Sequence, residues 1–341
     1  MTAAAAVREG VGRALRAPVI LAGTFVLTLL VSLPLAVALR GMIVAHLGMS
    51  LAADAAANAT NYGWWQEFLA QAAGLGTTFV PSIIGFGAVL QNLSDLVDNV
   101  PLATTVAGAV GAWLVLWSFL SGGILDRLAR NRATRAAGFF AACGRHFPAV
   151  ARLGVLALLA YGATFRWLQP WLLTTTFERL TRDMTVERSA FLARVMLYGV
   201  FGLVLIWINI VFDYARIRIV VEDRRSAIGA LLAGMRFVRR NGAGAAGVYA
   251  LNASLFLGLI LLYALLARGA TPGGAAGWMA LGVGELYILA RHYLKLAFYA
   301  SETALFQARL AHAGYTAAPP VVWPESPAAE NIANARRVPH S

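Results

Sequence analysis

Six long apolar segments constrain the fold of this chain more than any other feature. A helix needs about 20 mainly apolar residues to cross a bilayer, because the hydrocarbon core is about 30 Å thick and each residue adds about 1.5 Å. The runs are continuous and lack the alternation of a transmembrane barrel, so they predict helices. The predicted spans are 18–39, 102–125, 153–176, 191–212, 244–267 and 277–300.

The composition agrees with an all-α integral membrane protein. Hydrophobic residues make up 59% of the 341 residues and charged residues only 13%, whereas soluble domains have roughly half and about a quarter. The mean hydropathy is +0.67. A soluble chain would lack the polar side chains needed to cover its surface. The single cysteine, Cys143, excludes an internal disulfide.

The positions of the basic residues predict the orientation. Of the 28 lysines and arginines, 19 lie before the first span, in the second-to-third and fourth-to-fifth connections, and in the C-terminal tail. Only four lie in the connections on the other side. By the positive-inside rule, both termini are predicted to be cytoplasmic in a multi-pass protein of the inner (plasma) membrane. No nucleic-acid-binding motif accompanies the positive charge, so no nucleic-acid partner is predicted.

Two segments leave alternatives open. Residues 1–38 resemble a cleavable signal peptide, although the length of the apolar run favours a retained helix. Residues 41–101 contain no Lys or Arg and are predicted to form an extracytoplasmic cap, with Trp64 and Trp65 at the interface. Whether the uncharged part 68–94 has a re-entrant piece, near 79–90, stays open. The polytopic domain would then be 1–315, followed by a disordered, Pro-rich cytoplasmic tail, 316–341.

An internal repeat accompanies the two large basic connections. Residues 138–145 align with 229–236 at an offset of 91 residues, which predicts two units of span, basic amphipathic helix and span. In the second unit, Ile228, Leu231, Leu232, Met235 and Val238 form an apolar stripe at helical spacing. Such helices either lie on anionic lipid of the cytoplasmic leaflet or pack under the bundle, where their arginines only set the topology. The candidate lipid contacts are Arg135, Arg145, Arg224, Arg225, Arg236, Arg239 and Arg240.

The stretch 212–231 and the segment 237–241 resemble a broad bacterial family. This family is the membrane domain associated with glycerophosphodiester phosphodiesterases, together with its stand-alone six-helix relatives. The matching positions are Asp223, Ser226, Ala230, Leu231, Arg240 and Asn241. The resemblance implies a six-helix bundle. It implies no phosphodiesterase activity, because the segment after Ala300 is too short for that catalytic domain.

A polar stripe in the sixth span is the strongest candidate site. Glu285, Arg291, His292 and Lys295 lie within about a third of the helix circumference at 100° per residue, with Tyr299 and Glu302 on the same stripe. A charge at the bilayer centre costs roughly 2.5–3.5 kcal/mol, so the stripe should face the protein interior. Counted from the cytoplasmic ends, Arg166 matches Glu285 in depth, and Asn252 matches His292. The predicted intramembrane polar pocket comprises Arg166, Asn252, Glu285, Arg291, His292 and Lys295.

Two interpretations stay open: the pocket binds an anionic group or relays a proton, or a buried Arg166–Glu285 pair only fixes the helix register, and the second is favoured. No catalytic motif is present: residues 242–247 match a dinucleotide-binding pattern but lack the required strand. We therefore expect a non-enzymatic bacterial protein, without a cofactor or metal, that binds or moves a lipid or amphiphile or forms the membrane part of an envelope assembly. The alternative is an accessory subunit of a membrane complex with no ligand. Expected partners are anionic lipids and other membrane subunits.

Overall fold

A computed structural model describes residues 1–48, 50–58, 61–79, 85–267 and 274–310. The structure is 88% helical, and the described residues form no strand. Among them, five helical segments are long and apolar enough to cross a membrane. These are α2 (Pro18–Leu47), α6 (Thr104–Arg130), the run Ala136–Thr181 that contains α7 and α8, α9 (Glu187–Val221) and α11 (Gly242–Leu266). The prediction of an all-helical chain with several potential membrane spans is confirmed.

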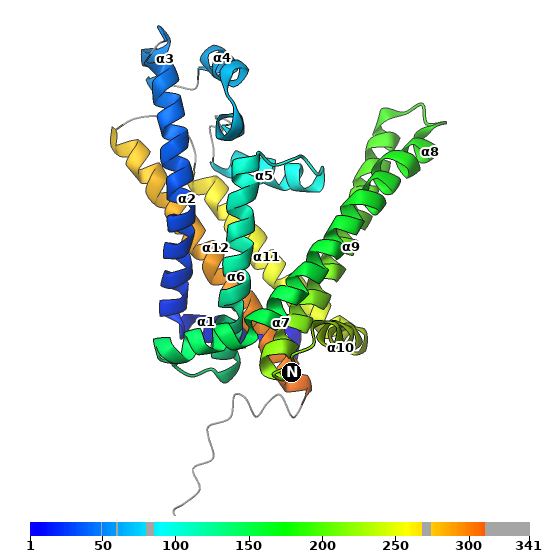
Figure 1. Cartoon of the computed structure of the whole chain (residues 1–341). Helices are drawn as coiled ribbons and strands as arrows, with labels where there is room; N and C mark the ends of the chain where they lie inside the picture. The colour runs from blue at the N-terminus through cyan, green and yellow to red at the C-terminus, as the bar shows by residue number, and fades with distance from the viewer. Residues whose placement is uncertain (49, 59–60, 80–84, 268–273, 311–341) are drawn as a thin grey trace, which may run out of the picture.

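The sixth predicted span lies in α12 (Gly274–Arg309), the longest single helix of the described chain. It falls outside the five apolar segments because Glu285, Arg291 and Lys295 lower its mean hydropathy. Figure 1 shows α2, α6, α11 and α12 as one group of long helices, while α7, α8 and α9 form an arm that diverges from them.

One end of the molecule carries short helices, and the first turns of a longer one, that lie across the ends of the long helices. They are α1 (Ala3–Leu15), the first turns of α7 (Ala136–Ala163) and α10 (Ala227–Arg240), and we call this end the basal end (Figure 1). The N-terminus and the last described turns of α12 also lie there. Its core includes Ile124, Leu125, Tyr214, Leu305 and Phe306, all fully or almost fully buried. Elsewhere the long helices expose large apolar side chains, as expected where lipid is the solvent.

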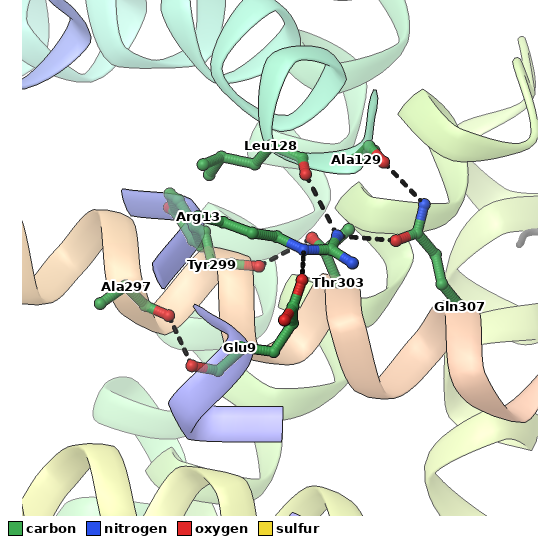
Figure 2. A network of polar contacts seen from close by, with 9 residues as sticks. Glu9, Arg13, Leu128, Ala129, Ala297, Tyr299, Thr303 and Gln307 are labelled. Atoms are coloured by element: carbon green, nitrogen blue, oxygen red, sulfur yellow. Dashed lines mark hydrogen bonds and ion pairs between the residues drawn. The ribbon is translucent and has the colours of Figure 1, made fainter. Parts of the chain in front are cut away.

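Polar contacts at the basal end join α1, α6 and α12. The last carbonyl groups of α6 have no partner within their helix. Arg13 Nη1 donates to Leu128 O (3.2 Å) and to Gln307 Oε1 (2.8 Å), and Gln307 Nε2 donates to Ala129 O (3.0 Å) (Figure 2). Glu9 pairs with Arg13 at 3.0 Å. One arginine and one glutamine therefore satisfy the end of α6 and fix α1 against the bundle.

The first predicted repeat unit differs from the structure. Residues 138–147 do not form a separate amphipathic helix, because α7 runs without interruption through Pro148 into the predicted span. A proline inside a helix removes one backbone hydrogen bond, here to the carbonyl of Gly144, and its ring favours a kink without ending the helix in this case. Gly144 is exposed, so solvent can bind this carbonyl. The run continues through the π-helical segments η2 (Thr164–Leu168) and η3 (Trp171–Thr176) to α8 (Phe177–Thr181).

In the second unit α10 is a separate helix, and it packs on α9. Ser226 caps it by accepting a hydrogen bond from Gly229 N at 3.1 Å. A Cβ atom at Gly234 would lie 2.9 Å from Ala215 N, so the two helices touch closely at this glycine. The predicted apolar stripe does not form one buried face, since Val238 is buried while Ile228 and Leu232 are exposed.

The segment 41–101 is largely helical where it is described. Beyond the end of α2 it forms α3 (Ala53–Asn58), α4 (Tyr62–Gln71), the 3₁₀ turn η1 (Gly74–Thr78) and α5 (Gly85–Val97). Trp64 is buried within it and donates from Nε1 to His46 Nδ1 (2.9 Å), while the predicted position of Trp64 and Trp65 at the membrane interface stays a prediction. Part of the predicted re-entrant piece, 80–84, and the tail 316–341 lie outside the described residues.

Candidate functional site

A cavity of about 460 Å³ lies between α6, α9, α11 and α12, and we call it the central cavity. This volume falls in the range of about 300–1,000 Å³ that small-molecule sites occupy. Apolar side chains from three of the helices form part of its wall. They are Leu114 of α6, Phe256 of α11, and Leu294 and Phe298 of α12.

A charged pair from α9 forms one side of the central cavity. Asn209, Asp213 and Arg216 are spaced by four and three residues, which places them on one helix face. Arg216 Nη1 donates to Asp213 Oδ1 (3.0 Å), and Asn209 Nδ2 donates to Asp213 Oδ2 (3.0 Å). Both oxygens of this carboxylate are therefore satisfied, as burial of a charge requires.

Three further side chains extend this network across the cavity. Arg216 Nη1 also donates to the hydroxyl of Tyr299 at 2.8 Å, and Trp117 Nε1 donates to the same oxygen at 3.2 Å. The ammonium of Lys295 lies 4.2 Å from the centre of the Trp117 ring, a cation–π contact. These contacts hold four side chains in place: Trp117 of α6, Arg216 of α9, and Tyr299 and Lys295 of α12.

Positive charge exceeds negative charge at the cavity wall. Among the residues that the structure describes, Arg216, Arg291 and Lys295 line it together with a single carboxylate, that of Asp213. The Asp213 and Arg216 side chains are only 8% and 21% exposed, whereas Arg291 and Lys295 are exposed. Among the described residues no carboxylate lies within ion-pair distance of Arg291 or Lys295. Two accessible cations are thus available to an anionic ligand.

Asn252 contributes a hydrogen-bonding group that the fold does not satisfy. Its amide Nδ2 donates to Val248 O (2.9 Å), but within the described residues its Oδ1 atom is buried and has no donor. The residue lines the central cavity and is only 3% exposed. Buried polar groups are rarely left unpaired, so this oxygen is an unsatisfied acceptor beside the cavity.

The structure brings together half of the six residues predicted for the polar pocket. Asn252, Arg291 and Lys295 line the central cavity. His292 instead faces α2, where its Nε2 atom lies 2.8 Å from Thr28 Oγ1. Glu285 lies outside the cavity, with a buried Oε2 atom that has no hydrogen-bond donor among the described residues.

Arg166 is not in the predicted pocket. It belongs to η2, in the arm formed by α7, α8 and α9, and its side chain is exposed. In the described part of the chain no ion pair joins it to Glu285, so the expected Arg166–Glu285 pair does not form. Equal depth along two helices does not make them neighbours, and Figure 1 shows the arm diverging from α12.

Sequence reasoning missed the α9 side of the site. The predicted fourth span ends at residue 212, which places Arg216 in a cytoplasmic connection, whereas α9 continues as a helix to Val221. The spacing of Asn209, Asp213 and Arg216 was the available signal, since it places three polar groups on one face of an apolar helix.

The predicted lipid contacts all have exposed side chains at or near the basal end. These residues are Arg135, Arg145, Arg224, Arg225, Arg236, Arg239 and Arg240. Exposure is compatible with lipid binding and equally with a purely topological role. Within the described residues, no three His, Cys, Asp or Glu side chains gather as metal ligands would.

Comparisons of the chain with protein-family models, with curated proteins and with solved structures find no match. The resemblance of the 212–241 region to the phosphodiesterase-associated membrane domain therefore stays a prediction. The geometry of the central cavity is the basis for assigning a function.

Proposed function

We propose that this protein binds an anionic lipid or amphiphile in the central cavity, as a non-enzymatic protein of the bacterial inner membrane. The observation that carries the proposal is the pairing of two accessible cations, Arg291 and Lys295, with an apolar wall in one cavity. An amphiphile has the same two parts. Its anionic head would contact the cations, and its apolar part would lie along Phe256, Leu294 and Phe298.

We also propose that α12 is a sixth membrane span. Its charged groups Arg291 and Lys295 line a cavity between helices, so they need not face lipid, where charge is costly. Both termini would be cytoplasmic, because the arginine-rich segments of α1 and α10 gather at the basal end. The short basal helices would then lie in or under the headgroup layer of the cytoplasmic leaflet.

Replacing Lys295 by glutamine is expected to weaken binding of an anionic amphiphile by roughly 10- to 100-fold, since a hydrogen bond to a charged group contributes about 1.5–3 kcal/mol. Native mass spectrometry of the detergent-purified protein, titrated with phosphatidylglycerol, measures this as loss of discrete lipid adducts. Phosphatidylcholine serves as the zwitterionic comparison.

Arg166→Gln is the matched control, because it also removes a positive charge from a predicted span but lies outside the cavity. Its adducts should equal those of the unmodified protein. Equal adduct loss in both variants, or no preference for phosphatidylglycerol, would contradict the proposal. Discrete protein adducts that persist in both variants, without bound lipid, would identify an accessory subunit instead.

A further inference from the structure

A second, smaller cavity lies at the basal end, where α10 meets the ends of α9 and α12. Its volume is about 200 Å³, and we call it the arginine cavity. Four arginines line it: Arg218, Arg224, Arg236 and Arg240. They come from the end of α9, from the α9–α10 connection and from two successive turns of α10. The positive-inside rule accounts for arginines on this side of a membrane, but it does not require them to converge on one concavity.

One carboxylate partly neutralises this charge. Glu222, with a side chain only 7% exposed, forms ion pairs with Arg218 (3.6 Å) and Arg224. Two of the four guanidinium groups at the cavity therefore pair with the same carboxylate. Arg236 and Arg240 are also separated by four residues on α10, a spacing at which like charges repel each other. A bound anion would relieve this repulsion.

Arg218 has a buried nitrogen atom that lacks a hydrogen-bond acceptor among the described residues. Its guanidinium lies over the Phe306 ring at 5.4 Å, and its Nε atom is buried with no acceptor among the described residues. Buried donors are normally paired, by protein, water or ligand. The cavity wall thus includes one buried guanidinium donor, Arg218 Nε, that the described residues leave unpaired.

We propose that the arginine cavity is a binding site for a phosphate group. Guanidinium groups match the geometry of phosphate oxygens with paired, charge-assisted hydrogen bonds. The cavity is smaller than most drug-sized ligand sites, so it fits a phosphate or a phosphorylated head group. This site is separate from the central cavity and does not depend on the function proposed there.

Two sources can supply this group: a soluble phosphate and the head group of a phospholipid. Ile228 and Leu232 precede Arg236 by eight and four residues on the same face of α10, and they are 62% and 51% exposed. Exposed apolar side chains beside phosphate-binding arginines are typical of helices in the headgroup layer. The experiment therefore needs one arm for each source.

Arg240→Gln is the test variant and Arg239→Gln its control. The two arginines are adjacent, exposed and equal in charge, but only Arg240 lines the cavity. In the first arm, the full chain in a phosphate-free maltoside detergent is titrated with inorganic phosphate by calorimetry. In the second arm, phosphatidic acid replaces phosphate, and native mass spectrometry counts the lipid adducts. Thermal unfolding without ligand checks that both variants are folded.

Arg240→Gln should weaken binding by roughly 10-fold or more in whichever arm shows binding, and Arg239→Gln by no more than about 2-fold. Binding of phosphatidic acid alone identifies a lipid head group as the ligand. Binding of inorganic phosphate identifies a soluble source. Either result supports the site. Absence of binding in both arms would overturn it. Equal weakening by the two variants would also overturn it, because binding would then depend on net charge alone.

Discussion

Replacing Arg216 by methionine is expected to lower the free energy of unfolding by about 3 kcal/mol, since removing one partner of a buried ion pair leaves the other charge uncompensated. Asp213, only 8% exposed, would lose the guanidinium that contacts it at 3.0 Å and would keep, of the described side chains, only Asn209 as a hydrogen-bond donor. Attraction from the nearby Lys295 limits the loss to the lower end of the usual range of about 3–5 kcal/mol.

Two further variants test whether the loss of stability depends on the Asp213–Arg216 ion pair. Arg145→Met removes an exposed arginine near the basal end and should change stability by no more than about 0.5 kcal/mol. The double variant Asp213→Asn, Arg216→Met should recover most of the lost stability, because neither charge then remains buried alone. Chemical unfolding in a fixed detergent measures all three. A loss for Arg216→Met no larger than that for Arg145→Met would show that the pair does not stabilise the bundle.

Replacing Gly10 by alanine is expected to cost about 3 kcal/mol, because an added Cβ atom has no space there. It would lie 2.2 Å from Ser301 Oγ and 2.5 Å from Ser301 N, so relief requires movement of the α12 backbone or of α1 itself. Movement of α1 would also pull Arg13 away from Leu128 O and Gln307, which share one network (Figure 2). The single methyl group should therefore loosen the whole basal end.

Gly12→Ala is the control, in the same helix and with the same change. No atom outside the α1 backbone lies within 4 Å of a Cβ at this position, and alanine favours helices over glycine by about 1 kcal/mol. Gly12→Ala should thus raise the unfolding temperature slightly, while Gly10→Ala lowers it. If both substitutions stabilise the protein, α1 does not pack against Ser301 as closely as the structure requires.

Apolar run length predicted the helical class because it depends only on local composition and on bilayer thickness. The stripe on α12 was also predictable, since helical geometry fixes which residues share a face. Arg291 and Lys295 accordingly lie together at the central cavity, while His292, at the edge of the stripe, faces α2. The periodicity gives the face of one helix but not the identity of the helix opposite.

The remaining wrong predictions depend on which helices pack against each other, and the sequence of one segment does not contain this information. Arg166 and Glu285 match in depth, but the arm carrying Arg166 diverges from α12, and packing between distant segments decides this. Arg216 was placed in a connection because the predicted fourth span ends at residue 212, although its pairing with Asp213 and Tyr299 allows it to lie within a helix between other helices. The repeat at 138–145 predicted a separate basic helix before the span 153–176, yet α7 is one continuous helix over both.

The central claim is that an anionic amphiphile occupies the central cavity. The most direct test is a cryo-electron microscopy map of the protein extracted with its surrounding bilayer by a polymer, with an antibody fragment bound to increase its size. We expect non-protein density between Lys295 and Arg291, continuing as an elongated apolar feature along Phe256. A cavity filled only by water or by a second protein chain would contradict the claim.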